Sequence, residues 1–122
     1  MEQFIEVKER KTWEFNATEK EKKDLAQKFE FDRVDAVKGS LSLEPVTDPV
    51  PCWLLKGQMT AKLVFEGEEQ IIDFPIETYI VSSERELKEL DMKYDAEIEN
   101  AKGQIDLGDL LGQHIYLSLM EY

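Results

Sequence analysis

The sequence has few cysteines and histidines, the residues that most often form disulfides, bind metals or take part in catalysis, and few prolines. Of its 122 residues, one is cysteine, one is histidine and four are proline. The lone Cys52 excludes an intramolecular disulfide and any Cys-x-x-Cys site. A chain of this length buries roughly two thirds of its unfolded surface on folding. We therefore expect one domain over residues 1–122 that needs neither a disulfide nor a metal for stability.

Long apolar runs are missing as well. No stretch approaches the roughly 18 consecutive apolar residues that a membrane-spanning helix requires. The first residues also lack the basic and then apolar regions of a signal peptide. We expect a cytoplasmic protein with no membrane partner.

Positive charge is scarce, with 15 basic and 27 acidic side chains and a net charge of −12. Residues 1–30 hold seven of the basic and eight of the acidic residues, which leaves eight basic and 19 acidic residues for the rest of the chain. Such an acidic body is unfavourable for binding along a phosphate backbone. It is typical of a solvated surface that keeps a protein soluble. The alternative is an acidic face for a basic partner, such as a ribosomal protein.

Alternating apolar and polar residues predict five main strands, over residues 4–7, 12–15, 34–43, 53–65 and 70–81. The last two are expected to form a long antiparallel hairpin, because the loop between them is short and contains a glycine. A weaker alternation indicates a strand over 94–99, followed by a turn over 100–103. The prolines at 45, 49 and 51 are expected to break the chain into a loop.

Three helices are predicted from their start signals. Thr18 and Glu21 form a capping box for a helix over 18–29. A second capping box precedes a short helix over 83–90, and an aspartate caps a leucine-rich helix over 106–119. Together the elements predict an α+β fold. It has a twisted, mostly antiparallel sheet closing towards a barrel, with the C-terminal helix packed on one sheet face and the 18–29 helix on a second surface.

The sequence shows no constellation of catalytic residues. His114 lies on or beside the apolar face of the last predicted helix, where a packing role explains it. Asp106 and Asp109 are explained as helix-start residues rather than as paired catalytic carboxylates. The acidic cluster over 66–69 lacks the spacing of a calcium loop. We expect no enzymatic activity, no cofactor, no metal and no small-molecule substrate.

Three segments, in this order along the chain, resemble one family. The first is 17–29 followed by 37–45, the second is 55–64, and the third is 103–119. The third segment has an Ile-Asp-Leu start, a leucine-rich helix and a Leu-x-Leu ending. Together they resemble the YceD family of large ribosomal RNA subunit accumulation proteins, and the first segment is similar to alphaproteobacterial-type members. The residues of the third segment that carry the resemblance are Ile105, Asp106, Leu107, Leu110, Leu111, Leu117 and Leu119.

The sequence departs from this family at one motif. Many members carry one or two cysteines just after the strand that matches residues 63–64, where this chain has Phe65-Glu66-Gly67-Glu68. No metal or thiol role is therefore carried over from the family.

The resemblance implies a non-enzymatic factor that supports accumulation of large-subunit ribosomal RNA. It would act through contacts with a ribosome-assembly protein or a pre-ribosomal particle. The alternative is direct RNA binding through the lysine-rich N-terminal strand and helix, because RNA binding needs a local basic surface. The residues of that candidate surface are Lys8, Arg10, Lys11, Lys20, Lys22, Lys23 and Lys28.

Overall fold

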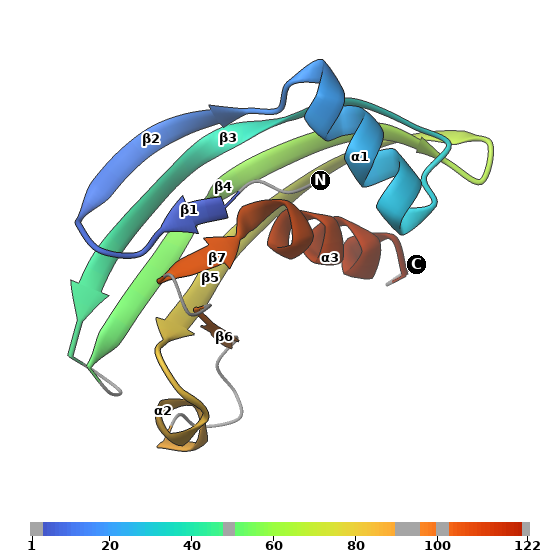
Figure 1. Ribbon diagram of the computed structural model, residues 1–122. Coiled ribbons are helices and arrows are strands. Elements are labelled where there is room, and N and C mark those ends of the chain that lie inside the picture. The colour runs from blue at the N-terminus through green and yellow to red at the C-terminus, as the bar shows by residue number, and fades with distance from the viewer. Residues whose placement is uncertain (1–3, 48–50, 90–95, 100–102, 121–122) are drawn as a thin grey trace.

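The computed structural model describes residues 4–47, 51–89, 96–99 and 103–120, which form an α+β fold with two sheets. A five-stranded sheet has the order β2-β3-β4-β5-β6, and a two-stranded sheet pairs β1 with β7 (Figure 1). The strands are β1 (Phe4–Glu6), β2 (Lys11–Asn16), β3 (Arg33–Val46), β4 (Cys52–Phe65), β5 (Glu68–Val81), β6 (Ala96–Ile98) and β7 (Gln104–Asp106). The helices are α1 (Glu19–Phe29), α2 (Glu84–Glu89) and α3 (Leu107–Met120).

Strands β3, β4 and β5 form an antiparallel meander of three 14-residue strands. Strands β4 and β5 are the hairpin that the sequence predicts. Their turn consists of Glu66 and Gly67, with φ of 51° and 80°. Positive φ at both central residues is the mark of a type I′ turn, whose twist matches that of the flanking strands. Alternate side chains of the meander point into one buried core, which includes Leu41, Leu55 and Met59.

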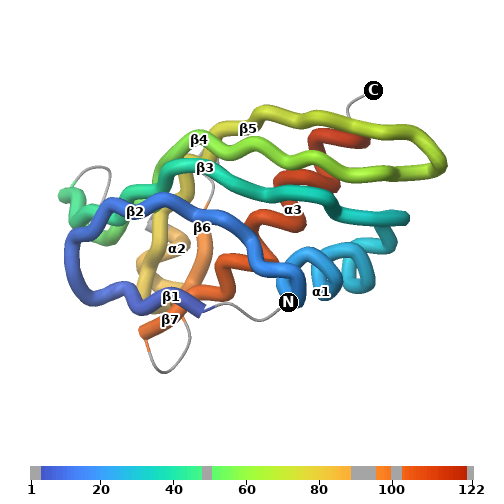
Figure 2. The backbone as a smooth tube through the Cα atoms, turned by 90° about the horizontal axis from the view of Figure 1, so that it is seen from above, coloured from blue at the N-terminus to red at the C-terminus, as the bar shows by residue number. Residues whose placement is uncertain are grey.

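The sheet is strongly curved, and two glycines face its concave side. A Cβ on Gly57 would lie 2.0 Å from the carbonyl oxygen of Ser40, and one on Gly39 would lie 2.2 Å from that of Gln58. Only a residue without a side chain allows strands β3 and β4 to approach so closely. Figures 1 and 2 show the curved sheet with α1 and α3 beneath it.

The five-stranded sheet is mostly antiparallel, as expected, but the expected barrel and helix placement need correction. The sheet does not close, and it is mixed because β6 pairs with β5 in parallel. Both α1 and α3 lie on the concave side (Figure 1), and neither covers a separate surface. The two helices fill the space that a closed barrel would enclose, so the sheet buries its apolar face without joining its edges.

The predicted helix starts are confirmed. At α1, the Glu21 amide donates to Thr18 Oγ1 at 3.2 Å and the Thr18 amide donates to Glu21 Oε1 at 2.8 Å, which is a capping box. At α3, the Asp109 amide donates to Asp106 Oδ1 at 3.1 Å. At α2, the amide of the third helical residue donates to Ser83 Oγ at 3.3 Å.

The proline-rich break begins later than the sequence predicts, because β3 runs through Pro45 to Val46. Pro45 lies opposite Trp53 of β4, two residues beyond the last pair between β2 and β3. Its nitrogen therefore faces the side of β3 that β2 no longer covers, where no backbone donor is needed. Parts of four predicted elements lie outside the described residues. They are 48–50 of the loop, 90 of the short helix, 94–95 of the strand and 100–102 of the turn.

Helices α1 and α3 contact each other through a glycine. Gly112 of α3 lies against the ring of Phe29, and a Cβ at that position would be 2.0 Å from the ring. Beside this contact, Lys28 Nζ lies 2.8 Å from Asp109 Oδ1. The close approach seats both helices under the sheet.

The sequence did not reveal the pairing of β1 with β7. Phe4 pairs with Asp106 and Glu6 with Gln104, and the amide of Val7 donates to the carbonyl of Gly103 at 2.8 Å. The segment before α3 is thus a strand, and it ties the first described residues of the chain to the start of α3.

Candidate functional site

The basic residues predicted to contact RNA do not form one surface. Lys8, Arg10 and Lys11 lie around the connection from β1 to β2, and the other four lie on α1. Strand β2 separates the two groups (Figure 1), and its six residues span roughly 20 Å. A phosphate backbone would have to contact two separate basic patches.

Several of these basic side chains are already paired with carboxylates. Lys22 Nζ lies 2.6 Å from Glu19 Oε1, donates to the carbonyl of Asp35 at 3.2 Å and is mostly buried. Lys8 Nζ lies 2.8 Å from a Glu6 oxygen, and this pairing raises the pKa of Lys8. Lys28 is the third paired lysine, and its partner is Asp109 of α3. Such pairs leave less positive charge available for RNA.

Lys20 and Lys23 are exposed on α1. Next to Lys23 is a hollow of about 690 Å³ between α1 and the start of β3, lined by equal numbers of acids and bases. Its arginine is paired, since Arg33 Nε donates to Asp35 Oδ1 at 2.7 Å. That pairing lowers the pKa of Asp35 and raises that of Arg33. The charges of this hollow largely satisfy one another.

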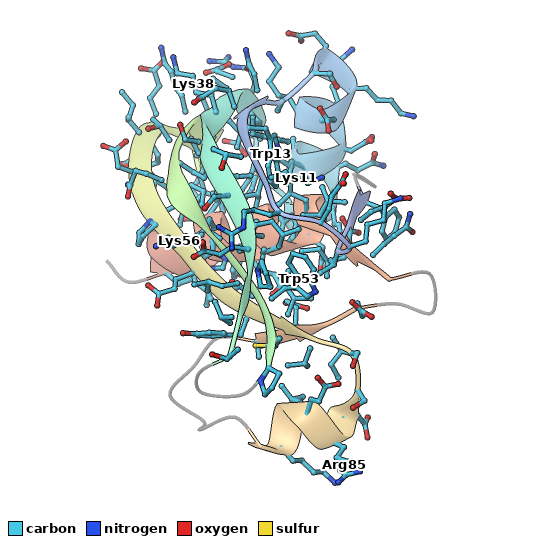
Figure 3. The ribbon with its side chains drawn as sticks, turned by 90° about the vertical axis from the view of Figure 1, so that its left-hand side faces the viewer. Lys11, Trp13, Lys38, Trp53, Lys56 and Arg85 are labelled. Carbon is cyan, nitrogen blue, oxygen red and sulfur yellow. The ribbon has the colours of Figure 1, made fainter. Side chains whose placement is uncertain are left out.

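The remaining labelled basic residues are spread over the molecule (Figure 3). Lys38 and Arg85 lie at opposite ends of this view, and Lys56 lies between them on the sheet. Lys11 Nζ lies over the ring of Trp13, 4.7 Å from its centroid. The basic side chains therefore gather on no single face.

The seven residues of the third segment that carry the family resemblance have mainly structural roles. Five of them are buried, and Asp106 caps the helix. Leu117 is an exception, because it is 61% exposed although the leucine spacing of the predicted helix puts it on the same face as Leu110. The buried residues are Ile105, Leu107, Leu110, Leu111 and Leu119.

Leu117 lines a groove between β5 and α3, which we call the β5–α3 groove. One part, of about 530 Å³, lies between β5, β6 and α3. A second part, of about 450 Å³, lies next to the β4–β5 turn. Among the described residues, neither lining contains a lysine or arginine. The lining residues are Phe74, Pro75, Glu77, Thr78, Ala96, Glu97, Leu110, Gln113, His114, Leu117 and Ser118 in the first part, and Phe65, Glu66, Glu68, Gln70 and Leu119 in the second.

His114 has a packing role in the wall of this groove, as the sequence predicts. Its Nδ1 lies 2.9 Å from the carbonyl oxygen of Leu110. Because a carbonyl only accepts, Nδ1 carries the proton that is donated to Leu110. The ring also stacks on Phe74, with centroids 6.2 Å apart and planes 23° apart.

Two polar groups in the same part of the groove lack a compensating partner. Thr78 is 1% exposed, and its Oγ1 has no hydrogen-bond partner in the described parts of the chain. Glu97 is half-buried, and burial followed by the negative charge of Asp109 raises its pKa. A hydroxyl without a partner and a disfavoured carboxylate are both stabilised by an incoming cationic donor.

The outer edge of β5 borders this groove and is open over most of its length. In a two-residue hairpin the residues that flank the turn exchange backbone hydrogen bonds, so Phe65 and Glu68 face each other. The backbone N–H and C=O groups of successive residues in a strand point to opposite sides. Those of Glu68 point to β4, so those of residues 69, 71, 73, 75 and 77 point away from it. On that outer side β6 pairs only with Tyr79–Val81, so within the described residues nothing pairs with 69–77.

Pro75 supports this assignment of the edge. It pairs with Gln58 at a position where its missing N–H points outward and breaks no bond to β4. The outward backbone therefore offers donors at 69, 71, 73 and 77 and carbonyl acceptors at all five positions. This is the hydrogen-bonding pattern that an added strand needs.

Other kinds of site have less support. No group of three His, Cys, Asp or Glu side chains in the described residues is placed to hold a metal ion. The thiol of Cys52 is partly buried, which raises its pKa and makes it less reactive. No helix among the described segments is long and apolar enough to span a membrane.

Comparison of the chain with protein-family models, with curated proteins and with solved structures finds no match. The YceD-family resemblance therefore stays a prediction from three segments of sequence.

Proposed function

We propose that this protein is a non-enzymatic ribosome-biogenesis factor that supports accumulation of large-subunit ribosomal RNA by binding a protein of the assembling particle. The ribosomal setting is what the three-segment resemblance implies. The binding mode rests on the β5–α3 groove, which lies beside an open strand edge. The charged side chains that the described part of the chain contributes to its lining are acidic, apart from His114. Many proteins that bind ribosomal RNA carry basic extended segments, and such segments complement an acidic groove.

Depletion of the protein tests the proposal in cells. We expect the ratio of large- to small-subunit ribosomal RNA to fall, and an unchanged ratio would contradict the ribosomal setting. An affinity pulldown from native lysate, with and without ribonuclease, tests the binding mode. Capture of a basic protein after ribonuclease treatment supports protein binding, and loss of all capture would contradict it.

Direct RNA binding through α1 is the second candidate function. It is favoured by Lys20 and Lys23, which are both exposed on α1, and Lys23 lines the hollow beside this helix. Gel-shift titrations against ribosomal RNA fragments at about 50 and 200 mM salt should then show salt-sensitive binding. Reversing the charge of Lys20 and Lys23 should weaken it, whereas Lys38→Glu on the sheet is the matched control. Equal effects of both changes would contradict a site on α1.

A further inference from the structure

We propose that the outer edge of β5 binds a basic, extended segment of a partner protein as an added strand, with alternate side chains of that segment entering the β5–α3 groove. This inference rests on the proposed function in that the partner is a protein. It goes further by naming the strand edge, the conformation of the segment and its charge.

The backbone of β5 makes strand addition geometrically suitable. Residues 69–77 present an unpaired edge of roughly 30 Å, at about 3.3 Å per residue. The meander fixes this strand firmly, because β5 pairs with β4 along its whole length. Strand β6 already occupies the far end of the same edge, so an incoming strand would continue the line of β6 along the sheet.

The charges select a basic segment. The residues whose backbone groups point outward include Glu69, Asp73 and Glu77 and no basic residue. All three side chains are exposed, and of the three Glu77 has a basic residue, Lys56, opposite it on β4. The groove on the other face of the strand adds Glu68 and Glu97. Lysines and arginines opposite these acids would form favourable cross-strand pairs on both faces of the added strand.

The same charges disfavour a second copy of this chain. Two β5 edges side by side would place acidic residues against acidic residues, which is destabilising in a strand pair. An RNA strand is disfavoured for the same reason, because its phosphates would face these carboxylates. Charged residues and Pro75 thus protect the edge from self-association while leaving it open to a basic strand.

The groove also explains how side chains of the segment would be held. Leu117 is 61% exposed in the groove wall, and Ile71 is 70% exposed on the opposite face of the edge. Each offers an apolar contact to a segment with apolar residues among its basic ones. Thr78 Oγ1 and the Glu97 carboxyl would accept hydrogen bonds from one lysine or arginine head group.

A synthetic peptide tests the inference without altering the protein. The probe is a fluorescein-labelled octapeptide of alternating arginine and valine, measured by anisotropy against the full chain. Two further peptides carry N-methyl groups on all arginine or on all valine amides, which keeps the charge but blocks one side of the strand backbone. We expect one methylated peptide to bind at least about tenfold more weakly and the other to bind like the probe. Equal binding of all three would overturn strand addition.

Protein variants locate the site. Ile71→Pro removes one outward N–H and leaves the ladder to β4 intact, whereas Ile71→Val keeps both the N–H and the apolar side chain and is its matched control. We expect only the proline variant to weaken probe binding about tenfold or more. Glu68→Gln with Glu97→Gln should also weaken binding, and Glu44→Gln on β3 should not. Equal effects of the proline and valine variants would overturn the edge, with unchanged thermal melting as the test of folding.

The native pulldown separates this inference from the proposed function. If Ile71→Pro still captures the ribonuclease-resistant partner, the proposed function stands and the β5 site is wrong. If the wild type captures no protein and its depletion leaves ribosomal RNA unchanged, the proposed function itself fails. An Ile71→Pro-sensitive dimer in light scattering, or RNA binding that this variant abolishes, would each overturn the basic segment as the occupant.

Discussion

The α1 side and the α3 side of the concave face differ in how their charges are compensated. The α1 side has more basic residues, yet its hollow pairs them internally, as in the contacts of Lys22 with Glu19 and of Arg33 with Asp35. The α3 side has fewer charges, but the described residues that line its groove include acids and no lysine or arginine. Its strand edge and its Thr78 hydroxyl also have no partner in the described chain. The difference teaches that unsatisfied groups indicate a binding surface better than the number of like charges does.

The largest expected effect comes from Gly57→Ala, because it would damage both sides at once. The new Cβ would lie 2.0 Å from a backbone oxygen of β3, which cannot move aside without unbending the sheet. We expect a loss of about 3 kcal/mol or more in the free energy of unfolding, measured by urea denaturation. Gly67→Ala is the control, since its φ of +80° costs only about 1 kcal/mol and nothing lies within 4 Å. Equal losses would contradict the close approach of β3 and β4.

Gly112→Ala would push α3 away from α1, because the two helices are in contact at Gly112. Helix propensity alone would make alanine more stable by about 1 kcal/mol. The clash of the Cβ with the Phe29 ring should instead destabilise the protein by about 1–3 kcal/mol. Adding Phe29→Leu should recover part of the loss in the same denaturation experiment. A stabilised single variant would show that the helices do not approach as described.

Glu97→Gln tests the uncompensated carboxyl of the α3 side and should have a smaller effect. Because the folded state raises the pKa of Glu97, the folded state binds its proton more tightly than the unfolded state does. Stability linked to Glu97 is therefore present at low pH and is lost as the pH rises from the ordinary glutamate pKa through the raised one. The glutamine variant should be slightly more stable than the wild type at neutral pH, and the difference should vanish in acid.

Asp35 on the α1 side is the control, because its pKa is shifted in the opposite direction to that of Glu97. Arg33 lowers its pKa, so its contribution to stability is present above the ordinary aspartate pKa and is lost as the pH falls through the lowered one. Asp35→Asn should therefore cost stability at neutral pH. The same sign of change for both variants, in thermal melts across this pH range, would contradict the contrast between the two sides.

The smallest expected effect is that of Lys28→Met, which breaks the ion pair joining the two sides. Lys28 and Asp109 are about half and one third exposed, so solvent screens their attraction. We expect a loss below about 1 kcal/mol that disappears at high salt. Lys23→Met, on the outer side of α1, is the matched control. A larger, salt-independent loss would mean that packing of the lysine stem holds the helices together.

Sequence patterns predicted the elements whose signals are local. The capping box at Thr18, the long hairpin and the cap at Asp106 rest on neighbouring residues, and all three are confirmed. The patterns did not predict strand pairing between residues that are far apart in the sequence. Alternation cannot show that β6 lies parallel to β5, nor that β1 pairs with β7.

Less of the candidate site than of the fold could be predicted from the sequence. Composition suggested an acidic face for a basic partner but not its location. Leu117 follows the helical period of its buried neighbours, and only the position of β5 leaves it in a groove. Pro75 was the one local signal of an open edge, since proline is tolerated in a strand where its nitrogen faces no partner.

The pairing of β1 with β7 has a consequence during synthesis. Phe4 is translated about a hundred residues before its partner Asp106. The β3–β5 meander is complete earlier, because its contacts are between neighbouring strands, but its apolar concave face is covered only by α1 until α3 has left the ribosomal tunnel. A nascent or stalled chain therefore exposes part of its core to chaperones and proteases. Translation pauses over the codons of α3 should lower the yield of folded protein more than pauses over the codons of β1.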